Sequence, residues 1–280
     1  MQVRSGVWHE FVTADRNAEG PVAIDLSSAR WADPVVAAGV ATVVQRAKAE
    51  GREVSFTPPM SPDTAGYLAR MRLGKVLDEL GVAHGLPTVN ERNQEGNLLE
   101  LRTFSTEHDG EELAALVYDR VSEMPQVDAQ VVEPLQNALM EIAINTALHA
   151  GVDHGYALAQ TYPTKGVIKF CVADAGIGLK ASLDRNGQLH PNDDSHALEL
   201  AVVRQMSGTD DPYRGYGLHD VVSTVRGLGG VTEIASGTAS TRFLTEEKAG
   251  DVSDVSYALP LESAYSGVIV QVTIPWVPGR

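Results

Sequence analysis

The segment EIAINTALHA (141–150) restricts the fold of this chain more than any other. With the preceding VVEPLQNALM it predicts a helix whose side chains are apolar almost all round. At about 100° per residue, Glu141, Asn145 and His149 fall on one arc of roughly 80°. A helix that is apolar on its other sides is normally buried. Other elements must therefore surround it, and its polar arc must face something other than an apolar core.

Composition and charge exclude several classes of protein. The formal net charge of −15 argues against a general nucleic-acid surface and against a surface for anionic membranes. No run approaches 18 consecutive apolar residues, and the first residues lack an apolar signal core, so we expect a cytoplasmic protein without a membrane span. Cys171 is the only cysteine, which excludes a disulfide framework and a cysteine zinc site within one chain.

Residues 1–84 predict a small α/β unit, because β-branched and aromatic stretches alternate with segments of helical period. The expected order is β-β-α-β-α, with strands at 7–11, 21–28 and 52–59 and helices at 33–51 and 61–81. Residues 85–98 are polar and without periodicity, and we interpret them as a linker.

Residues 99–280 predict a second α/β unit. Helical periods occur at 109–124, 128–150 and 218–230, and the expected strands lie at 98–104, 156–162, 166–174, 230–237 and 266–275. A chain of this length accommodates two such units.

Two glycine-containing motifs follow the opening helix. The strand VIKFCVAD ends in Asp174 and turns through DAGIG (174–178), and RGYGL (214–218) begins another helical pattern. Glycines let the backbone pass close to a ligand, and N–H groups at a helix start favour phosphate. DAGIG lacks the third glycine of a Rossmann fingerprint, and no GxxxxGK[ST] is present, so a P-loop is excluded.

In this order and spacing, the motifs resemble the GHKL, or Bergerat-fold, ATPases over residues 100–280. ExxxNxxxHA resembles the N-box of that family, DAGIG its first glycine box and RGYGL its second, while LGGVTEIASG and VIVQVTIP resemble its closing strands. The resemblance implies a two-layer α/β sandwich, in which helices cover one face of a mixed sheet. It also implies ATP and Mg²⁺ as ligands.

The resemblance assigns a role to each motif. Asn145 would ligate Mg²⁺, which prefers one or two protein oxygens besides phosphates and waters. Glu141, one turn earlier on the same face, would be the general base. Asp174 would accept a hydrogen bond from the adenine amino group. The remaining ATP-binding positions would be Gly176, Ile177 and Gly178 near the adenine, and Arg214, Gly215, Tyr216, Gly217 and Leu218 near the phosphates.

The segment from Leu179 to Tyr213 would form a lid over the nucleotide. The cations of this segment are Lys180, Arg185 and Arg204, and Arg214 directly follows it. Arg214 is the first choice for binding phosphate, because it adjoins the glycine pair.

One position departs from the family. Val268 stands where many members have a threonine that supports the adenine-binding acid, with Ser266, Thr238 and Thr241 nearby in sequence.

The first unit resembles STAS-like domains over about residues 8–82, through the IDLS strand, the following helix and the YLARM helix. Regulatory members carry a phosphoacceptor serine after an aspartate at a helix start. Here Pro34 follows Asp33, and proline suits a first helical turn but accepts no phosphate. We therefore expect a docking unit for a protein partner or for a second copy of the chain.

Several alternatives remain open at this stage. Glu141 and Asn145 could be a buried polar pair that fixes helix packing, and His149 with His154 lacks the HExxH spacing of a zinc site. His108-Asp109 lies at a strand-to-helix junction, which is the wrong context for an autophosphorylating histidine kinase. The favoured function is an ATP-hydrolysing conformational switch that acts on a protein partner. The alternatives are an anti-sigma-type serine/threonine kinase of a separate STAS protein and a nucleotide-binding module without turnover.

Overall fold

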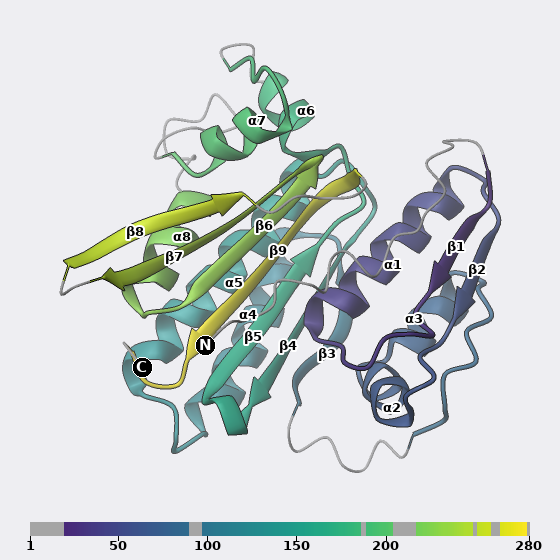
Figure 1. Ribbon diagram of the computed structural model, residues 1–280, viewed down its shortest axis with the longest axis horizontal. Coiled ribbons are helices and arrows are strands. Elements are labelled where there is room, and N and C mark those ends of the chain that lie inside the picture. The colour runs from purple at the N-terminus through teal and green to yellow at the C-terminus, as the bar shows by residue number, and fades with distance from the viewer. Residues whose placement is uncertain are drawn as a thin grey trace.

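A computed structural model describes residues 20–89, 97–185, 189–203, 217–248, 251–258 and 264–278. Within these ranges the fold is mixed α/β, with eight α-helices, a seven-stranded sheet and a two-stranded parallel sheet (Figure 1). The strand expected at 7–11 lies outside the described residues. None of the helices in the described ranges is long and apolar enough to cross a membrane.

The large sheet is the central layer, and its strand order is β3-β4-β5-β9-β6-β7-β8. Each neighbouring pair in it is antiparallel, which corrects the expected mixed sheet; the parallel pair, β1 and β2, forms a separate small sheet. The large-sheet strands are β3 Asn97–Phe104, β4 Gly155–Tyr162, β5 Val167–Ala173, β6 Val231–Gly237, β7 Ala239–Lys248, β8 Asp251–Ala258 and β9 Tyr265–Pro275.

One face of this sheet is covered by α4 (Glu107–Ser122), α5 (Ala129–His149) and α8 (Gly217–Gly227) (Figure 1). The apolar sides of α5 are buried through Leu135, Leu139 and Ile142, which join a core with Phe170 and Val272 of the sheet. The burial expected for this helix is therefore confirmed. Its start is capped by Asp128, whose Oδ1 accepts from the Gln130 N–H at 2.9 Å.

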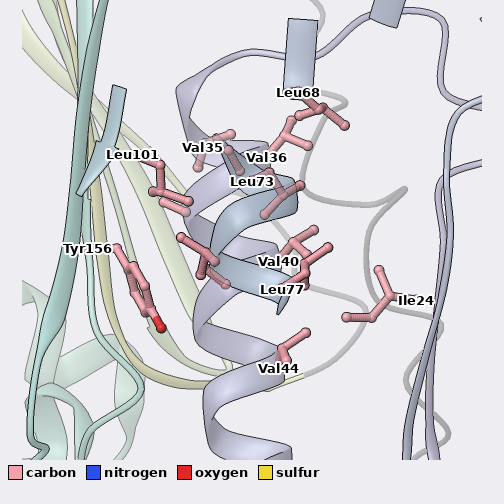
Figure 2. Close-up of a cluster of buried hydrophobic side chains, with 14 of the residues drawn as sticks. Ile24, Val35, Val36, Val40, Val44, Leu68, Leu73, Leu77, Leu101 and Tyr156 are labelled. Atoms are coloured by element: carbon pink, nitrogen blue, oxygen red, sulfur yellow. The ribbon is translucent and has the colours of Figure 1, made fainter. Parts of the chain in front are cut away.

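The opposite face is covered by α1 (Pro34–Ala49), which packs on β4, β5 and β9. Outside α1 lie β1 (Val22–Asp25), β2 (Val54–Thr57), α2 (Pro62–Arg70) and α3 (Leu73–Glu79). Figure 2 shows the valines of α1 in one buried cluster with Leu73 and Leu77 of α3 and Tyr156 of the sheet. One apolar core thus joins the N-terminal segment to the sheet, and helices cover both faces rather than one.

The single helix expected at 61–81 is two helices, because Arg72 adopts a left-handed φ of 62° between them. This break exposes the carbonyl of Met71, which accepts the Leu101 N–H of β3 at 3.1 Å. At this break, a hydrogen bond to the sheet replaces one within a continuous helix. Periodicity along 61–81 does not reveal the break, since both helices share one apolar stripe.

The hairpin of β7 and β8 has no counterpart in the sequence analysis. It lies at the edge of the sheet and carries polar cross-strand pairs, such as Thr245 Oγ1 with Asp254 Oδ1 at 3.0 Å. Edge strands bury little apolar surface, so their sequence lacks a clear alternation. The expected lid contains α6 (Gly178–Asp184) and α7 (Asp194–Ala201), which lie beyond one end of the sheet in Figure 1.

Candidate functional site

The polar arc of α5 begins with Glu141 and Asn145, which are both half-buried and one turn apart on the helix. Ile142 and Ala143 between them are buried in the core. The packing of α5 thus leaves this arc as its polar side. His149 is the last residue of the helix and is also half-buried.

The first residue of α8, Gly217, lies directly against Asn145. A Cβ at Gly217 would come within 2.2 Å of Asn145 Nδ2 and 3.3 Å of its Oδ1. Any residue with a Cβ at this position would have to displace the Asn145 carboxamide. The structure therefore brings the glycine of one motif onto the amide of another. Leu218 packs with the core beneath α8, and Arg214, Gly215 and Tyr216 lie outside the described residues.

Asp174 follows β5, is 2% exposed, and is held through its backbone and one carboxylate oxygen. Its N–H donates to the Val268 carbonyl at 2.9 Å. Its Oδ1 accepts the N–H groups of Gly176 at 2.8 Å and Val268 at 3.3 Å. Its backbone carbonyl accepts the Tyr265 hydroxyl at 3.1 Å. None of these bonds uses Oδ2, so the carboxylate is oriented while one oxygen stays available to accept.

Two residues of this arrangement, Gly267 and Tyr265, were missed by the sequence analysis. Gly267 has a φ of +97°, and a Cβ there would lie 2.1 Å from the Asp174 carbonyl oxygen. Val268 supports the acid with its backbone N–H, a role that any residue except proline can fill. The glycine within the strand was the available signal, since glycine in a strand often marks a close backbone approach.

Burial raises the pKa of Asp174 to about 7, and the hydrogen bonds from Gly176 and Val268 oppose that rise. A carboxyl group in this state exchanges its proton near neutral pH. It therefore accepts a hydrogen bond most strongly on the alkaline side of neutrality. Such a perturbed acid marks a candidate functional site.

The turn after Asp174 packs on the end of α5. The Ile177 N–H donates to the Ala150 carbonyl at 3.0 Å, and a Cβ at Gly176 would lie 2.1 Å from the same oxygen. Ala150 follows α5 and is five residues after Asn145, about 7.5 Å along a helix axis. The acid of one motif and the amide of the other therefore belong to one neighbourhood.

Ser236 of β6, a third residue that the sequence analysis missed, ties the start of α6 to this neighbourhood. Its Oγ accepts the Leu179 N–H at 2.9 Å and donates to the Gly267 carbonyl at 2.8 Å. Gly178 takes a φ of +77° beside that hydroxyl. The segment after Gly178 is thus attached to Gly267 of β9, which precedes the residue that holds Asp174.

The described part of the expected lid offers weak candidates for a phosphate-binding cation. Lys180 pairs with Asp184 of its own helix at 3.0 Å, and Arg185 is exposed. Arg204 lies outside the described residues, as does Arg214. Thr238 donates to Asp194 from its N–H and its hydroxyl, each at 2.8 Å. Thr238 therefore fastens α7 to the sheet in place of supporting Asp174.

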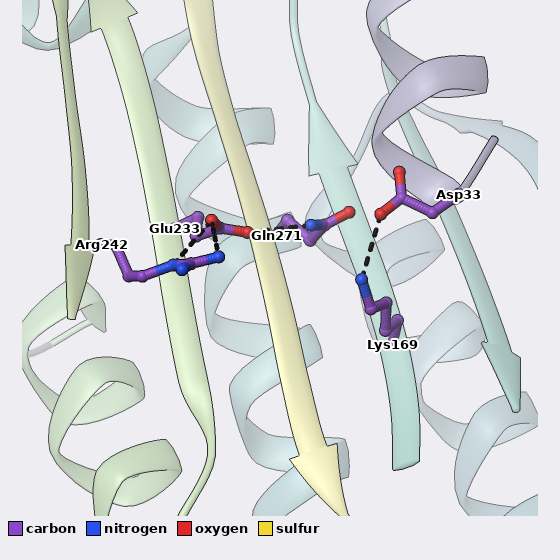
Figure 3. Close-up of polar contacts among 5 residues, drawn as sticks. All are labelled: Asp33, Lys169, Glu233, Arg242 and Gln271. Carbon is purple, nitrogen blue, oxygen red and sulfur yellow. Dashed lines mark hydrogen bonds and ion pairs between the residues drawn. The ribbon is translucent and has the colours of Figure 1, made fainter. Parts of the chain in front are cut away.

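Asp33 of the N-terminal segment directly precedes α1 and is buried. Its Oδ2 pairs with Lys169 Nζ at 3.1 Å, and burial raises its pKa against the opposing charge of Lys169. Figure 3 shows a row of polar side chains that continues through Gln271 and Glu233 to Arg242. The carboxylate of Glu233 accepts hydrogen bonds from the side chains of Gln271 and Arg242. Asp33 therefore joins α1 to the sheet.

Of the His108-Asp109 pair, Asp109 has a structural role. Asp109 Oδ2 accepts the N–H groups of Ser105 and Thr106 at 2.8 and 2.9 Å and so caps α4. In the described ranges, no three His, Cys, Asp or Glu side chains gather in a way that could hold a metal ion.

No model of a known protein family matches the sequence, and a search of curated proteins finds no match.

Proposed function

We propose that this chain binds ATP with Mg²⁺ and hydrolyses it slowly, as a conformational switch that acts on a protein partner. Its layout would be a STAS-like segment followed by a Bergerat-type nucleotide-binding unit. One observation carries the proposal. Asp174 is buried and oriented by three anchors, keeps Oδ2 available, and lies at a glycine turn that packs on the helix bearing Glu141 and Asn145.

The donors and acceptors of the site fit this ligand. Asp174 Oδ2 would accept from the 6-amino group of adenine. The carboxamide of Asn145 would supply an oxygen to Mg²⁺, which tolerates a single protein ligand when phosphates and waters complete its shell. When bound, Mg²⁺ neutralises phosphate charge. α8 begins at Gly217 against Asn145, and the free backbone N–H groups of its first turn would favour phosphate there.

Glu141 would be the general base for the attacking water. It lies one turn before Asn145 on the same face of α5, as base catalysis beside the metal ligand requires. The switch would operate through α6 and α7, because Ser236 and Asp194 connect these helices to the strands around Asp174. The N-terminal segment, with proline after Asp33, would serve the partner as a docking element.

Titration calorimetry with Mg²⁺-ATP tests the binding step. We expect Asp174→Asn to weaken affinity about tenfold, since it replaces a charged acceptor. Incubation with γ-labelled ATP, with and without candidate STAS proteins, tests turnover. Free phosphate alone supports the switch, label on a partner supports a kinase, and binding without turnover supports a nucleotide-holding module. Absence of Mg²⁺-ATP binding by the wild type overturns the proposal.

The role of Glu141 is tested by Glu141→Ala. We expect turnover to fall at least a hundredfold while ATP affinity stays within about threefold of the wild type. Glu133→Ala is the matched control, because Glu133 is an exposed acid on the same helix. Turnover that survives in Glu141→Ala at the level of Glu133→Ala excludes Glu141 as the base.

A further inference from the structure

Two buried hydroxyl groups connect α1 to the backbone of Asp174. Tyr265, the first residue of β9, is 8% exposed, and Thr42 in the middle of α1 is 1% exposed. The Tyr265 hydroxyl lies 2.7 Å from Thr42 Oγ1 and 3.1 Å from the Asp174 carbonyl oxygen. A helix of the N-terminal segment and the candidate adenine-binding acid thus share one hydroxyl.

A count of protons shows that the two contacts compete. Thr42 Oγ1 lies 3.1 Å from the Ala38 carbonyl and 2.9 Å from the Gly39 carbonyl, so its own proton bonds within α1. Toward Tyr265 it therefore acts as an acceptor. The Tyr265 hydroxyl has one proton for Thr42 Oγ1 and the Asp174 carbonyl together. Burial raises the pKa of the Tyr265 hydroxyl, which keeps that proton in place.

The hydrogen bond from Tyr265 fixes the one backbone group of Asp174 that Gly176 and Val268 do not bind. Gly176 and Val268 fix its Oδ1, and Val268 also accepts its N–H, while Tyr265 fixes its carbonyl. Gly176 lies in the turn after β5 and Val268 lies in β9, so both belong to the large sheet and its connections. Among the hydrogen bonds of the described ranges, the Tyr265 hydroxyl is the one that connects this acid to α1.

We propose that Tyr265 is a positioning residue for Asp174, and that α1 controls it through Thr42 by competing for the same proton. The proposal rests on the proposed nucleotide-binding function of Asp174. A displacement of α1 away from β9 would leave the Tyr265 proton wholly to the Asp174 carbonyl and tighten the orientation of the carboxylate. A partner that engages the N-terminal segment would thereby alter recognition of the 6-amino group of adenine.

The test measures the affinity of the intact chain for Mg²⁺-ATP and for purine ribonucleoside triphosphate, which lacks the 6-amino group. The ratio of the two affinities reports the Asp174 contact, whereas a general loss of stability lowers both affinities alike. The variants are Tyr265→Phe, Thr42→Val and, as the matched control, Tyr156→Phe. The Tyr156 hydroxyl is buried in the same layer but pairs with His154 Nε2 at 3.1 Å.

We expect Tyr265→Phe to reduce the preference for ATP about threefold to tenfold, the usual worth of one hydrogen bond. Thr42→Val should raise the preference above that of the wild type, because the competing acceptor is gone, and Tyr156→Phe should leave it unchanged. An unchanged preference in Tyr265→Phe, or an unchanged or lower preference in Thr42→Val, overturns the proposal.

Asp174→Asn separates this failure from failure of the proposed function. If Asp174→Asn lowers the preference and Tyr265→Phe does not, the hydroxyl link is wrong and the nucleotide site stands. If Asp174→Asn leaves the preference unchanged, the assignment of Asp174 fails and the positioning role falls with it. Should Tyr265→Phe fail to fold, Thr42→Val alone decides the proposal by the direction of its change.

Discussion

Gly217 approaches Asn145 so closely that a Cβ on the glycine would lie 2.2 Å from the carboxamide Nδ2. The two residues belong to α8 and α5, which pack side by side on one face of the sheet. The start of one helix is therefore shaped around a side chain of the other. This contact places two sequence motifs in a single site.

We expect Gly217→Ala to lower Mg²⁺-ATP affinity by about tenfold or more, because the new methyl group must displace the Asn145 carboxamide. Gly217 has no positive φ, so the substitution carries no backbone strain. Gly227→Ala at the other end of α8 is the control, since a Cβ there meets nothing within 4 Å. Calorimetry of both variants is the measurement. Equal affinities for the two would remove the contact from the site.

Gly267→Ala should destabilise the protein by roughly 3 kcal/mol or more, because its Cβ would lie 2.1 Å from the Asp174 carbonyl oxygen at a φ of +97°. Gly51→Ala isolates the cost of backbone conformation. Gly51 has a φ of +71° and open space around its Cβ, so we expect about 1–2 kcal/mol there. Chemical denaturation compares the two, and similar losses would contradict the close approach.

Asp174→Asn should change stability in a pH-dependent manner. The pKa of Asp174 is about 7 in the folded protein, above the ordinary value of 3.8. Between pH 4 and 7 the unfolded chain releases this proton first, so the wild type loses stability as pH rises. The variant lacks that loss. We expect the unfolding free energy of the variant, relative to that of the wild type, to rise by a few kcal/mol from pH 4 to 7 and then to stay constant.

Denaturation curves at pH 4.5, 6 and 8 measure this difference. Asp109→Asn is the comparison variant, because its stability relative to the wild type should change with pH in the opposite direction. Hydrogen bonds from Ser105 and Thr106 lower the pKa of Asp109. Its contribution is present above the unfolded pKa and is lost as pH falls through the folded value. The two variants should therefore diverge with pH. A pH-independent difference between Asp174→Asn and the wild type would refute the raised pKa.

Lys169→Met should destabilise the protein by about 3 kcal/mol at pH 8, because it leaves the buried Asp33 carboxylate without its cation. The loss should shrink at pH 5, since burial raises the pKa of Asp33 and protonation removes the unpaired charge. Adding Asp33→Asn should recover part of the stability at pH 8. Denaturation of the single and double variants measures the coupling.

Lys165→Met is the control for this ion pair. Lys165 lies over the same aromatic rings as Lys169, 5.3 Å from the Trp31 ring centre and 5.8 Å from that of Tyr162, but it is exposed and its ammonium does not pair with Asp33. We expect a loss below about 1 kcal/mol. An equal loss in the two lysine variants would attribute the effect to the rings rather than to Asp33.

Much of the secondary structure is predictable from local pattern. The helix that bears Glu141 and Asn145 and the strand that directly precedes Asp174 lie where their periodicity places them. Prediction failed where long-range contacts decided the outcome. The Met71 carbonyl bonds to β3 at a break that the apolar stripe conceals, and the edge hairpin of β7 and β8 buries too little to show an alternating pattern.

The sequence by itself determined which chemical groups the candidate site contains: an acid and an amide on one helical face, and a second acid before a glycine turn. Only the tertiary structure decided how they are held. Val268 orients Asp174 through backbone groups that any side chain but proline permits, so no residue type announces that role. Tyr265 and Asp33 meet their partners across layers, and such contacts have no local period.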